Sequence, residues 1–340
     1  MRRWELGSVP GQREDGLKIA LAIEGGGMRG VVSAGMVTGL EYLGLLPAFD
    51  VIYGTSAGAF NGAFFIAGQA AYGTTIYYEN INNLRFVNLL RPLVGKPAVS
   101  LEFLFEQVLI NEKILDWERV VNSPIPLKVV ASSIRHVRPE VLDGFKTRDD
   151  LFSCLKASAR IPVVAGPPVK VGEDDYLDGS LFASIPFHQA LEAGCTHVLA
   201  LLTRPVGQEP KGANAFDRYI VPTYLKRYNE QLKRVVTDRL RYYALDIDSL
   251  AKKTVNPDEG PYLFAVQPGS KSAPVGRLEK RRNQLIAGAR DGMTAIMEAF
   301  SLDIGSYVET LAPFDASGHG ISGVQSKTIA DRRVKISVQV

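Results

Sequence analysis

The chain has 340 residues, of which 46% are hydrophobic and 22% charged, proportions that are ordinary for a globular protein. This composition excludes wholesale disorder, a collagen-like rod and a polytopic membrane protein. Lys and Arg total 39 against 36 for Asp and Glu, so the net charge of +3 does not indicate a nucleic-acid-binding protein. Two cysteines, Cys154 and Cys195, are too few for a disulfide scaffold, and we expect free, mostly buried thiols.

Residues 1–16 contain three arginines but no adjoining apolar region, so we expect no signal peptide. The most apolar stretches, 31–46 and 57–71, are shorter than the ~20 residues that a bilayer span needs. We therefore expect these stretches to be buried core helices. The expected location is cytoplasmic, at most peripheral to the inner face of the membrane.

The first half of the chain alternates between strand and helix patterns. Residues 18–23 form a near-continuous apolar run, which is typical of a strand buried on both faces of a parallel sheet. Residues 72–117 predict a mixed, mainly helical region with breaks at Pro92 and Pro97. Further strands are predicted at 49–53, 127–132, 137–142, 169–171, 176–177 and 197–202. Further helices are predicted at 31–43, 57–67, 149–159 and 185–193.

The pattern changes near residue 214. Residues 217–248 lack glycine and carry apolar residues at helical spacing, which predicts one long helix with Pro222 in its first turn. Residues 277–300 predict a second long helix, and residues 262–266 one more strand. The tail from residue 313 gives no clear pattern.

The first chemical signal is a glycine-rich loop. Residues 25–30 read GGGMRG and lie between a predicted buried strand and a predicted helix. Glycines let the backbone turn sharply and present several N–H groups, and a helix N-terminus behind them favours negative charge. The loop matches the dinucleotide-binding pattern G-x-G-x-x-G at Gly25, Gly27 and Gly30. The same donors equally suit an oxyanion hole, and a tight turn without a ligand is a third interpretation.

The second signal favours the oxyanion hole. A dinucleotide-binding fold places an acidic residue at the end of its second strand. Here that strand runs into residues 54–58, GTSAG, which is G-x-S-x-G between a strand and an apolar helix. This context is that of a nucleophile elbow, in which Gly54 and Gly58 leave room for the strained turn. We therefore interpret Ser56 as the catalytic nucleophile.

A nucleophilic serine needs a base that accepts its proton. The chain order of an α/β-hydrolase triad is satisfied by Ser56 and Asp178 with either His188 or His197. However, Ser56 follows only the second strand, and both histidines have patterns typical of structural or surface residues. Asp178 is the better candidate, because it follows a predicted strand and precedes Gly179, which leaves its carboxylate accessible on a tight turn.

These motifs, in this order, resemble those of the patatin-like phospholipase family. The resemblance rests on residues 25–30, 54–58 and 178–179, supported by the ASARIP segment at 157–162, and covers about residues 17–203. The segment LAIE before the glycine loop is most similar to the bacterial branch. One departure is Ser180, where the family usually has glycine or alanine.

The resemblance implies a three-layer α/β/α fold with a mostly parallel central sheet and a largely helical C-terminal part. We expect a catalytic core at 17–210 and, from the helical patterns beyond the resemblance, a helical region at 211–312 packed on this core and a tail of unknown structure at 313–340. Ser56 is the implied nucleophile and Asp178 the implied general base, without a catalytic histidine. The implied oxyanion donors are the amides of Gly26, Gly27 and Met28. The supporting motif residues are Gly25, Arg29, Gly30, Gly54, Gly58 and Gly179, and no metal or cofactor is required.

The implied activity is hydrolysis of lipid acyl esters, of a phospholipid or lysophospholipid, through an acyl-serine. The basic and aromatic residues of 217–248 allow transient contact with an anionic membrane, although a solvated helix face explains them more simply. No nucleic-acid partner is expected. The competing hypotheses are a catalytically silent lipid-binding or regulatory protein, a Ser-His-Asp esterase, and a nucleotide-binding oxidoreductase, which lacks its expected acidic residue.

Overall fold

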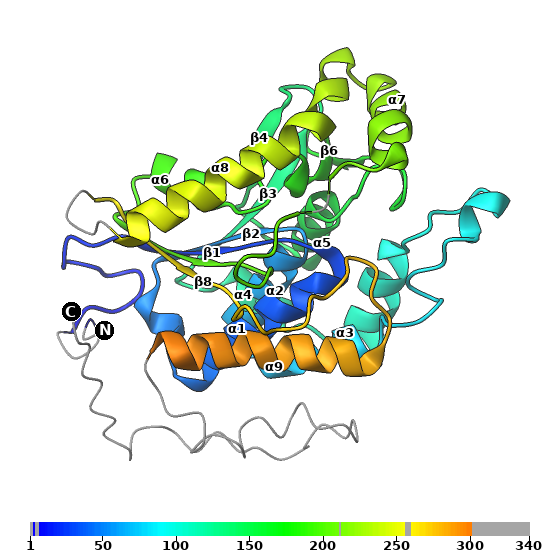
Figure 1. Cartoon of the computed structure of the whole chain (residues 1–340). Coiled ribbons are helices and arrows are strands. Elements are labelled where there is room, and N and C mark those ends of the chain that lie inside the picture. The colour runs from blue at the N-terminus through cyan, green and yellow to red at the C-terminus, as the bar shows by residue number, and fades with distance from the viewer. Residues whose placement is uncertain (1–2, 4–6, 211, 256–259, 301–340) are drawn as a thin grey trace.

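The computed structural model describes residue 3 and residues 7–210, 212–255 and 260–300 (Figure 1). Its centre is a sheet with the strand order β5-β6-β3-β2-β1-β7-β8, with β4 paired to β3 outside this path. The strands are β1 (Ile19–Ile23), β2 (Val51–Thr55), β3 (Leu127–Ser133), β4 (Arg138–Leu142), β5 (Val169–Val171), β6 (Asp174–Asp178), β7 (His197–Leu201) and β8 (Tyr262–Val266).

Five adjacent strands, β3, β2, β1, β7 and β8, are parallel. In register, Ile23 at the end of β1 pairs with Gly54 on β2 and with Leu201 on β7. The carboxyl ends of these strands therefore meet at one edge of the sheet. The segments that follow β1 and β2, which contain the glycine loop and Ser56, emerge together at this edge.

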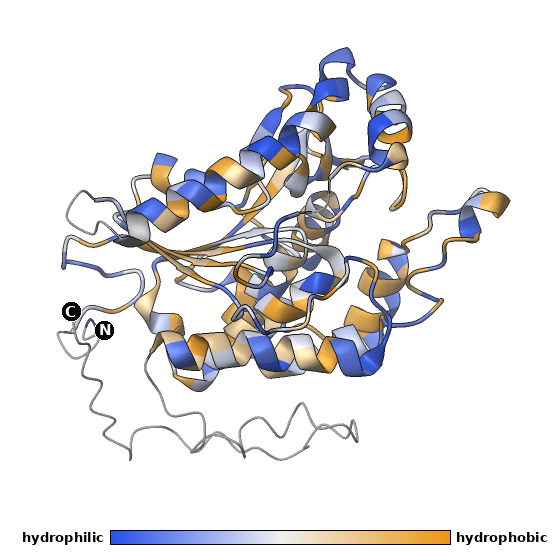
Figure 2. Ribbon diagram, viewed as in Figure 1, coloured by the Kyte–Doolittle hydropathy of each residue, from blue (hydrophilic) through white to orange (hydrophobic). Residues whose placement is uncertain are grey.

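Helices cover both faces of the sheet. Leu21 and Ile23 pack with α1 (Val31–Tyr42), α2 (Ala57–Ile66) and α9 (Arg282–Ala299). Ala20 and Ala22 face the opposite side and pack with α6 (Phe187–Glu192) and α8 (Val235–Val255). Figure 1 shows α8 on one side of the sheet and α1 and α9 on the other. The predicted three-layer α/β/α class is thus confirmed, and hydrophobic residues predominate in strands β1 and β8 of the central sheet (Figure 2).

The remaining helices lie around this core. They include α3 (Ala70–Glu79), α4 (Trp117–Val121), α5 (Arg148–Ser158) and α7 (Val221–Lys226), with a ten-residue π-helix at Phe103–Glu112 and a five-residue π-helical segment at Phe216–Ile220 that precedes α7. None of the described helices combines the length and the apolar character that crossing a bilayer demands. Cys154 and Cys195 are both buried and free.

The C-terminal region is part of the same core. Strand β8 extends the parallel sheet beyond β7, so the sheet continues past the predicted boundary at residue 210. Helix α9 crosses α1 closely, because Gly35 and Gly292 allow each backbone to approach the other. A Cβ atom at Gly292 would overlap the carbonyl oxygen of Val32. The division into domains stays a prediction, as does the tail at 313–340, which lies outside the described residues.

Two helix predictions were wrong in extent. The single helix expected at 217–248 is divided, because Asn229 has an extended backbone (φ −155°, ψ 126°) and its side chain caps the next turn by accepting from Gln231 N–H. The helix expected at 277–300 begins only at Arg282. The carboxylate of Glu279 accepts hydrogen bonds from two following amides, and residues 277–281 take an irregular path toward the glycine loop.

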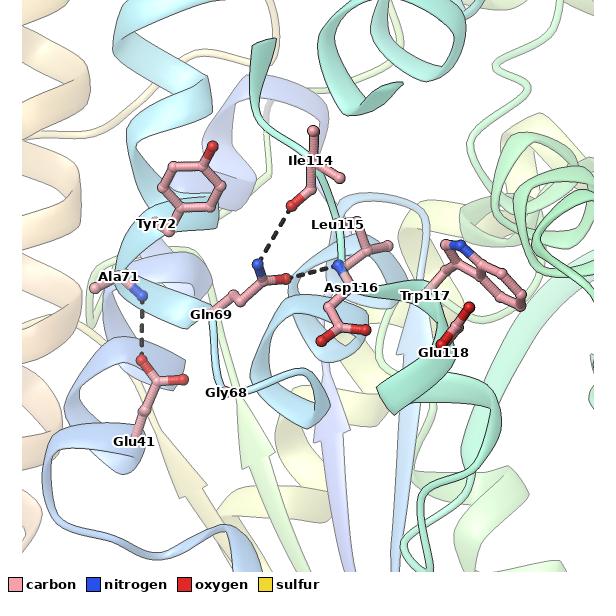
Figure 3. Close-up of a pocket in the computed structure, with 10 residues that line it drawn as sticks. All are labelled: Glu41, Gly68, Gln69, Ala71, Tyr72, Ile114, Leu115, Asp116, Trp117 and Glu118. Atoms are coloured by element: carbon pink, nitrogen blue, oxygen red, sulfur yellow. Dashed lines mark hydrogen bonds between the residues drawn. The ribbon is translucent and has the colours of Figure 1, made fainter. Parts of the chain in front are cut away.

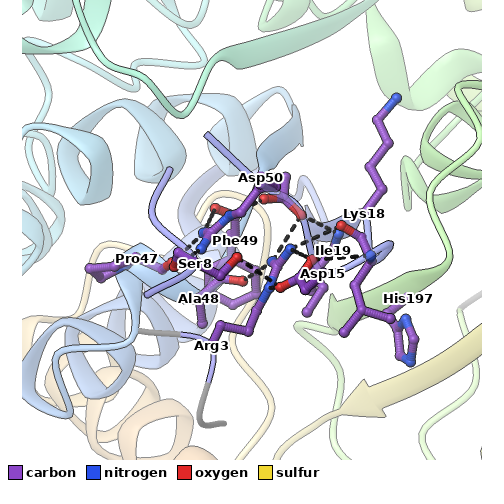
Figure 4. A network of polar contacts seen from close by, with 12 residues as sticks. Arg3, Ser8, Asp15, Lys18, Ile19, Pro47, Ala48, Phe49, Asp50 and His197 are labelled. Atoms are coloured by element: carbon purple, nitrogen blue, oxygen red, sulfur yellow. Dashed lines mark hydrogen bonds and ion pairs between the residues drawn. The ribbon is translucent and has the colours of Figure 1, made fainter. Parts of the chain in front are cut away.

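An ion-pair network holds the opposite edge of the sheet (Figure 4). Asp50 Oδ2 accepts from the Ile19 amide at 2.7 Å and from Arg3 at 2.9 Å, and Asp50 Oδ1 accepts from Arg13 at 2.7 Å. Arg3 also binds Asp15 and holds the pKa of that carboxyl well below its ordinary value. The segment before β1 therefore fixes the starts of β1 and β2, at the end of the sheet remote from the glycine loop.

We predict that Gly292→Ala lowers the free energy of unfolding by about 1–3 kcal/mol, because backbone atoms of α1 would have to move away from the new methyl group. Denaturant titration followed by circular dichroism measures the change. The matched control is Gly269→Ala, where a Cβ atom would meet nothing within 4 Å. Equal stability of the two variants would contradict the close crossing of α1 and α9.

Candidate active site

Ser56 occupies the sharp turn between β2 and α2. Its backbone angles are φ 54° and ψ −122°, in a region that non-glycine residues rarely adopt. The turn fits only because its neighbours are small, since a Cβ atom at Gly58 would overlap the carbonyl oxygen of Ile23. The end of β2, where a dinucleotide site needs a carboxylate, thus presents a strained serine. This is the geometry of a nucleophile elbow.

Asp178, at the end of β6, contacts this serine directly. Ser56 Oγ donates to Asp178 Oδ2 at 2.8 Å, and the two side chains belong to residues that are only 5% and 2% exposed. Asp178 Oδ1 accepts from the Ser180 amide at 2.8 Å, which fixes the carboxylate plane. Ser180 stands where the family usually has glycine or alanine, but this difference leaves the contact intact, because the donor is the backbone N–H group. The arrangement suits proton transfer from the hydroxyl to the carboxylate.

A second serine positions the elbow. Ser158, on α5, accepts a hydrogen bond from the Ser56 amide at 2.7 Å and donates to the Val130 carbonyl on β3 at 2.6 Å. Ser132 on the same strand donates to the Asp178 carbonyl at 2.8 Å. The sequence analysis assigned no role to either. Ser158 lies within the segment 157–162 that carried part of the resemblance, whereas nothing local distinguishes Ser132.

The glycine loop packs against the elbow. Gly25 and Gly30 carry no side chains where the loop meets Thr55 and Ala57, and a Cβ atom at Gly25 would lie 2.6 Å from the Thr55 carbonyl oxygen. Gly54 and Gly179 likewise sit where backbone atoms of α2 and β3 leave no room for a side chain. All the predicted supporting glycines therefore lie around the Ser56–Asp178 contact.

The three predicted oxyanion donors differ in their surroundings. The Met28 amide already donates to the Arg277 carbonyl oxygen at 3.0 Å. Within the described residues, the amides of Gly26 and Gly27 have no protein acceptor. Gly27 has φ 59°, a left-handed conformation that turns the loop sharply at this point. Two of the three predicted donors thus have no protein acceptor in the described part of the chain, whereas the Met28 amide is engaged by the Arg277 carbonyl oxygen.

Arg29 is a structural residue of this loop. Its Nε donates to Thr203 Oγ1 at 2.8 Å, and its guanidinium lies 3.4 Å from the Glu24 carboxylate. Glu24 also accepts from the Thr203 amide at 2.5 Å. Burial lowers the pKa of Arg29 to about 10, which the nearby Glu24 charge opposes. This buried pair ties the glycine loop to the end of β7.

An apolar pocket lies beside Ser56. It has a volume of about 60 Å³ and is bounded by the glycine loop, α2, α3, the π-helix, α5 and the 277–278 segment. Its apolar lining includes Phe60, Ile81, Phe86, Leu101, Phe105 and Leu155. A pocket of this composition offers hydrocarbon contact but few partners to a polar group.

A larger hollow on another part of the surface contains neither Ser56 nor Asp178 (Figure 3). It holds about 700 Å³ but is broadly open and lies between α3 and residues 114–118. Its polar groups serve the fold: Glu41 accepts from the Ala70 and Ala71 amides, and Gln69 bonds the Ile114 carbonyl and the Asp116 amide. None of the predicted site residues lines it.

Three arginines give the region around Asp178 a positive charge. Arg204 follows β7, Arg239 lies on α8 and Arg277 precedes α9. Asp178 interacts electrostatically with Arg239 and Arg277, and burial lowers the pKa of Arg239. Arg277 is exposed to solvent, and a hydrated guanidinium group stays protonated. Among the described residues none of the three pairs with a carboxylate within salt-bridge distance, and Arg204 Nε is buried without a hydrogen-bond partner.

Neither of the two candidate histidines contacts Ser56. His197 pairs in register with Ile19, at the start of β1, so it lies at the opposite end of the sheet from the elbow. His188 Nε2 instead contacts Asp246 at 2.9 Å and joins α6 to α8. The candidate triads of the sequence analysis are therefore not assembled, whereas the Ser56–Asp178 pair is.

One side-chain cluster has the composition of a metal site. His136, Glu140 and Asp174 hold ligand atoms within 4.8 Å of one another. Their oxygens are already engaged, since Asp174 accepts from Ser133 Oγ and Glu140 accepts from Tyr176 Oη at 2.9 Å. We assign no function to this cluster.

Comparison with known proteins agrees with the site geometry. A sequence model of the patatin-like phospholipase family matches residues 21–191, which is half of the chain and contains every predicted site residue. The chain belongs to the patatin-like phospholipase family. Assignment to its bacterial branch stays a prediction.

Two other proteins have sequences similar to that of this protein. The uncharacterized protein YjjU of Escherichia coli (strain K12) is 27% identical over 218 residues, covering 63% of this chain and 57% of that protein. The "Probable lipid hydrolase 463L" of Invertebrate iridescent virus 6 is 25% identical over 185 residues, covering 51% of this chain and 63% of that protein. The match thus spans less than two thirds of either relative.

A solved structure, VipD from Legionella pneumophila, aligns with 83% of this chain and 67% of its own at a TM-score of 0.38 and 10% identity. A structural similarity this weak supports no conclusion about this protein.

The family match ends at residue 191. Arg204, Arg239 and Arg277 therefore lie outside the region shared with the family, since all three follow that residue.

We predict that Ser158→Ala lowers kcat for a soluble ester by about ten- to a hundredfold with little change in KM, because the elbow loses the acceptor for the Ser56 amide. Steady-state kinetics measures both constants. The matched control is Ser153→Ala on the same helix, which should leave kcat within about twofold of the wild type. A Ser158→Ala protein that is folded and fully active would show that the elbow does not depend on this contact.

We predict that the His188–Asp246 pair stabilises the fold at low pH only. The hydrogen bond to Asp246 raises the pKa of His188 above 6.5. The contribution of the pair to the free energy of unfolding is therefore complete below pH 6.5, and it is lost as the pH rises through the pKa of His188 in the folded protein. His188→Ala should cost at most about 1 kcal/mol because the His188 side chain is 51% exposed. Thermal unfolding at about pH 5.5 and about pH 9 should show the cost only at the lower pH. The same substitution in an Asp246→Asn background should show no such difference, and a cost that is independent of pH would contradict the pairing.

Proposed function

We propose that this protein is a serine acyl hydrolase that cleaves an acyl ester of a phospholipid or lysophospholipid. The observation that carries the proposal is the 2.8 Å hydrogen bond from Ser56 Oγ to Asp178 Oδ2 on a strained strand-to-helix turn. A hydroxyl held against a carboxylate at such a turn is poised for nucleophilic attack. Membership of the patatin-like phospholipase family supports the same reaction class.

In the proposed reaction, Asp178 accepts the proton of Ser56 Oγ while this oxygen attacks the ester carbonyl carbon. The resulting oxyanion receives hydrogen bonds from the amides of Gly26 and Gly27, joined by Met28 once the Arg277 carbonyl withdraws. The carbon–oxygen bond of the ester then breaks, and Asp178 returns the proton to the departing alcohol. Water, deprotonated by Asp178, releases the fatty acid from Ser56. No proton carrier besides Asp178 is needed.

The substrate class follows from the surroundings of Ser56. The apolar pocket beside it offers hydrocarbon contact to the part of the acyl chain next to the ester. The unpaired charges of Arg204, Arg239 and Arg277 favour an anionic group on the alcohol side of the ester, as a phosphodiester or phosphomonoester provides. We therefore propose an anionic phospholipid or lysophospholipid as the preferred substrate. The lipid hydrolase name of the viral relative supports a lipid ester in general.

We predict that Ser56→Ala and Asp178→Asn each reduce kcat by about 10³-fold or more, because the first lacks the nucleophile and the second cannot accept its proton. Titration of an anionic and a choline lysophospholipid, with fatty-acid release as the readout, measures the loss. The matched controls are His188→Ala and His197→Ala, which should retain activity within about tenfold. A folded histidine variant without activity, beside an active Asp178→Asn protein, would replace the proposed pair with a triad.

A further inference from the structure

Residues 84–96 form a projection that we call the apolar tip. Figure 1 shows it as the cyan segment that extends away from the body of the molecule between α3 and the π-helix. A bridge between Val87 and Val99 closes its base, with the Asn88 amide donating to Ala98 at 2.8 Å. The tip turns through a short 3-10 helix (Arg91–Val94) and ends at Gly95, whose φ is 73°. The tip is therefore an ordered structure with a defined base.

The tip exposes large aliphatic side chains. Its exposed members, with the exposed fraction of each residue, are Leu84 (61%), Leu89 (65%), Leu90 (70%), Leu93 (83%) and Val94 (72%). These are the five most exposed aliphatic residues among the described part of the chain. Aliphatic side chains that protrude together into solvent mark an interaction surface, because water around them is released when they are covered.

The charge of the tip indicates what covers it. The tip carries Arg85, Arg91 and Lys96, and no acidic residue occurs between residues 80 and 101. Arg91 donates to the Leu84 carbonyl at 2.7 Å and so holds the turn, whereas Lys96 is exposed. If a second copy of this protein covered the tip with its own tip, the positive charges of the two copies would repel each other. A surface that is apolar beneath and anionic outside, as in a bilayer with anionic lipid, complements them.

The base of the tip is also a wall of the candidate active site. Phe86 and Val87 enter the tip, Val99 and Leu101 leave it, and all four line the apolar pocket beside Ser56. The exposed aliphatic residues and this wall of the pocket thus belong to one segment of the chain. A bilayer that covers the tip would therefore lie next to the segment that forms one wall of the pocket.

We infer that the apolar tip inserts into the surface of a bilayer that contains anionic lipid and docks the pocket mouth on it. The proposal that a lipid acyl chain then enters the pocket rests on the proposed function. The docking of the tip on the bilayer does not. In this arrangement the tip, rather than the basic residues of 217–248, makes the membrane contact. In the divided helix there Tyr219 is 69% exposed, but the most exposed aliphatic residues, Ile220 and Leu245, reach only 50%, less than any of the five in the tip.

Vesicle flotation tests the inference with the Ser56→Ala protein, so that lipid is not consumed. The probes are vesicles of phosphatidylcholine with and without phosphatidylglycerol. We expect the Leu90→Ser/Leu93→Ser variant to lose about tenfold or more in partition coefficient, because each leucine loses most of its apolar contact with lipid. The matched control, Ile220→Ser/Leu245→Ser, removes two aliphatic side chains that are each 50% exposed and lie outside the tip, and should bind as the parent does. Lys96→Glu should weaken binding only to vesicles with phosphatidylglycerol.

The remaining outcomes are equally decisive. With Ser56 restored, the tip variant should hydrolyse a short soluble ester within about twofold of the wild type, because neither leucine lines the pocket. Unchanged vesicle binding by the tip variant, or an equal loss in the control, would overturn the inference. So would a dimer without lipid that the tip variant converts to a monomer, since a second copy would then be the occupant. Binding that depends on the tip in a protein without hydrolase activity would uphold docking and refute the proposed function.

Discussion

Strand β3 is the element on which the candidate site depends. In register, Val130 on β3 pairs with Thr55, the residue before Ser56, and Ala131 pairs with Asp178. One strand therefore holds the parallel β2 and the antiparallel β6 so that their ends meet. The Val130 carbonyl also accepts from Ser158, which in turn holds the Ser56 amide. The 2.8 Å contact between Ser56 and Asp178 thus follows from the pairing of three strands rather than from either loop alone.

The C-terminal region completes the site from the other side. The Arg277 carbonyl binds the Met28 amide, and helix α9, which follows it, packs closely on α1, which follows the glycine loop. Movement of residues 277–278 would therefore alter both the surroundings of the Met28 amide, a predicted oxyanion donor, and a wall of the apolar pocket. The same region supplies Arg239 and Arg277, whose charge faces Asp178. The proposed catalytic pair, which lies within the family match, is in this way combined with a charge environment that lies outside it.

The parts of this account that could be predicted from sequence are local in the chain. Ser56, the glycine loop and Asp178 were recognisable because each motif needs specific neighbours within a few residues. The strands were predictable because a sheet covered on both faces produces continuous apolar runs. The contact between Arg277 and Met28 could not be predicted, since it joins segments distant in sequence. The break at Asn229 was hidden by helical spacing on both sides, where a side-chain cap outweighs periodicity.

The most direct test of the central claim is to identify the residue that becomes acylated. The protein would be mixed with an activated ester whose acyl-enzyme hydrolyses slowly, quenched in acid and mapped by peptide mass spectrometry. The account predicts one acyl group per chain, on the peptide containing Ser56, formed much more slowly in the Asp178→Asn protein. Acylation of another residue, or turnover of the ester without any covalent adduct under conditions that trap one in a known serine hydrolase, would contradict it.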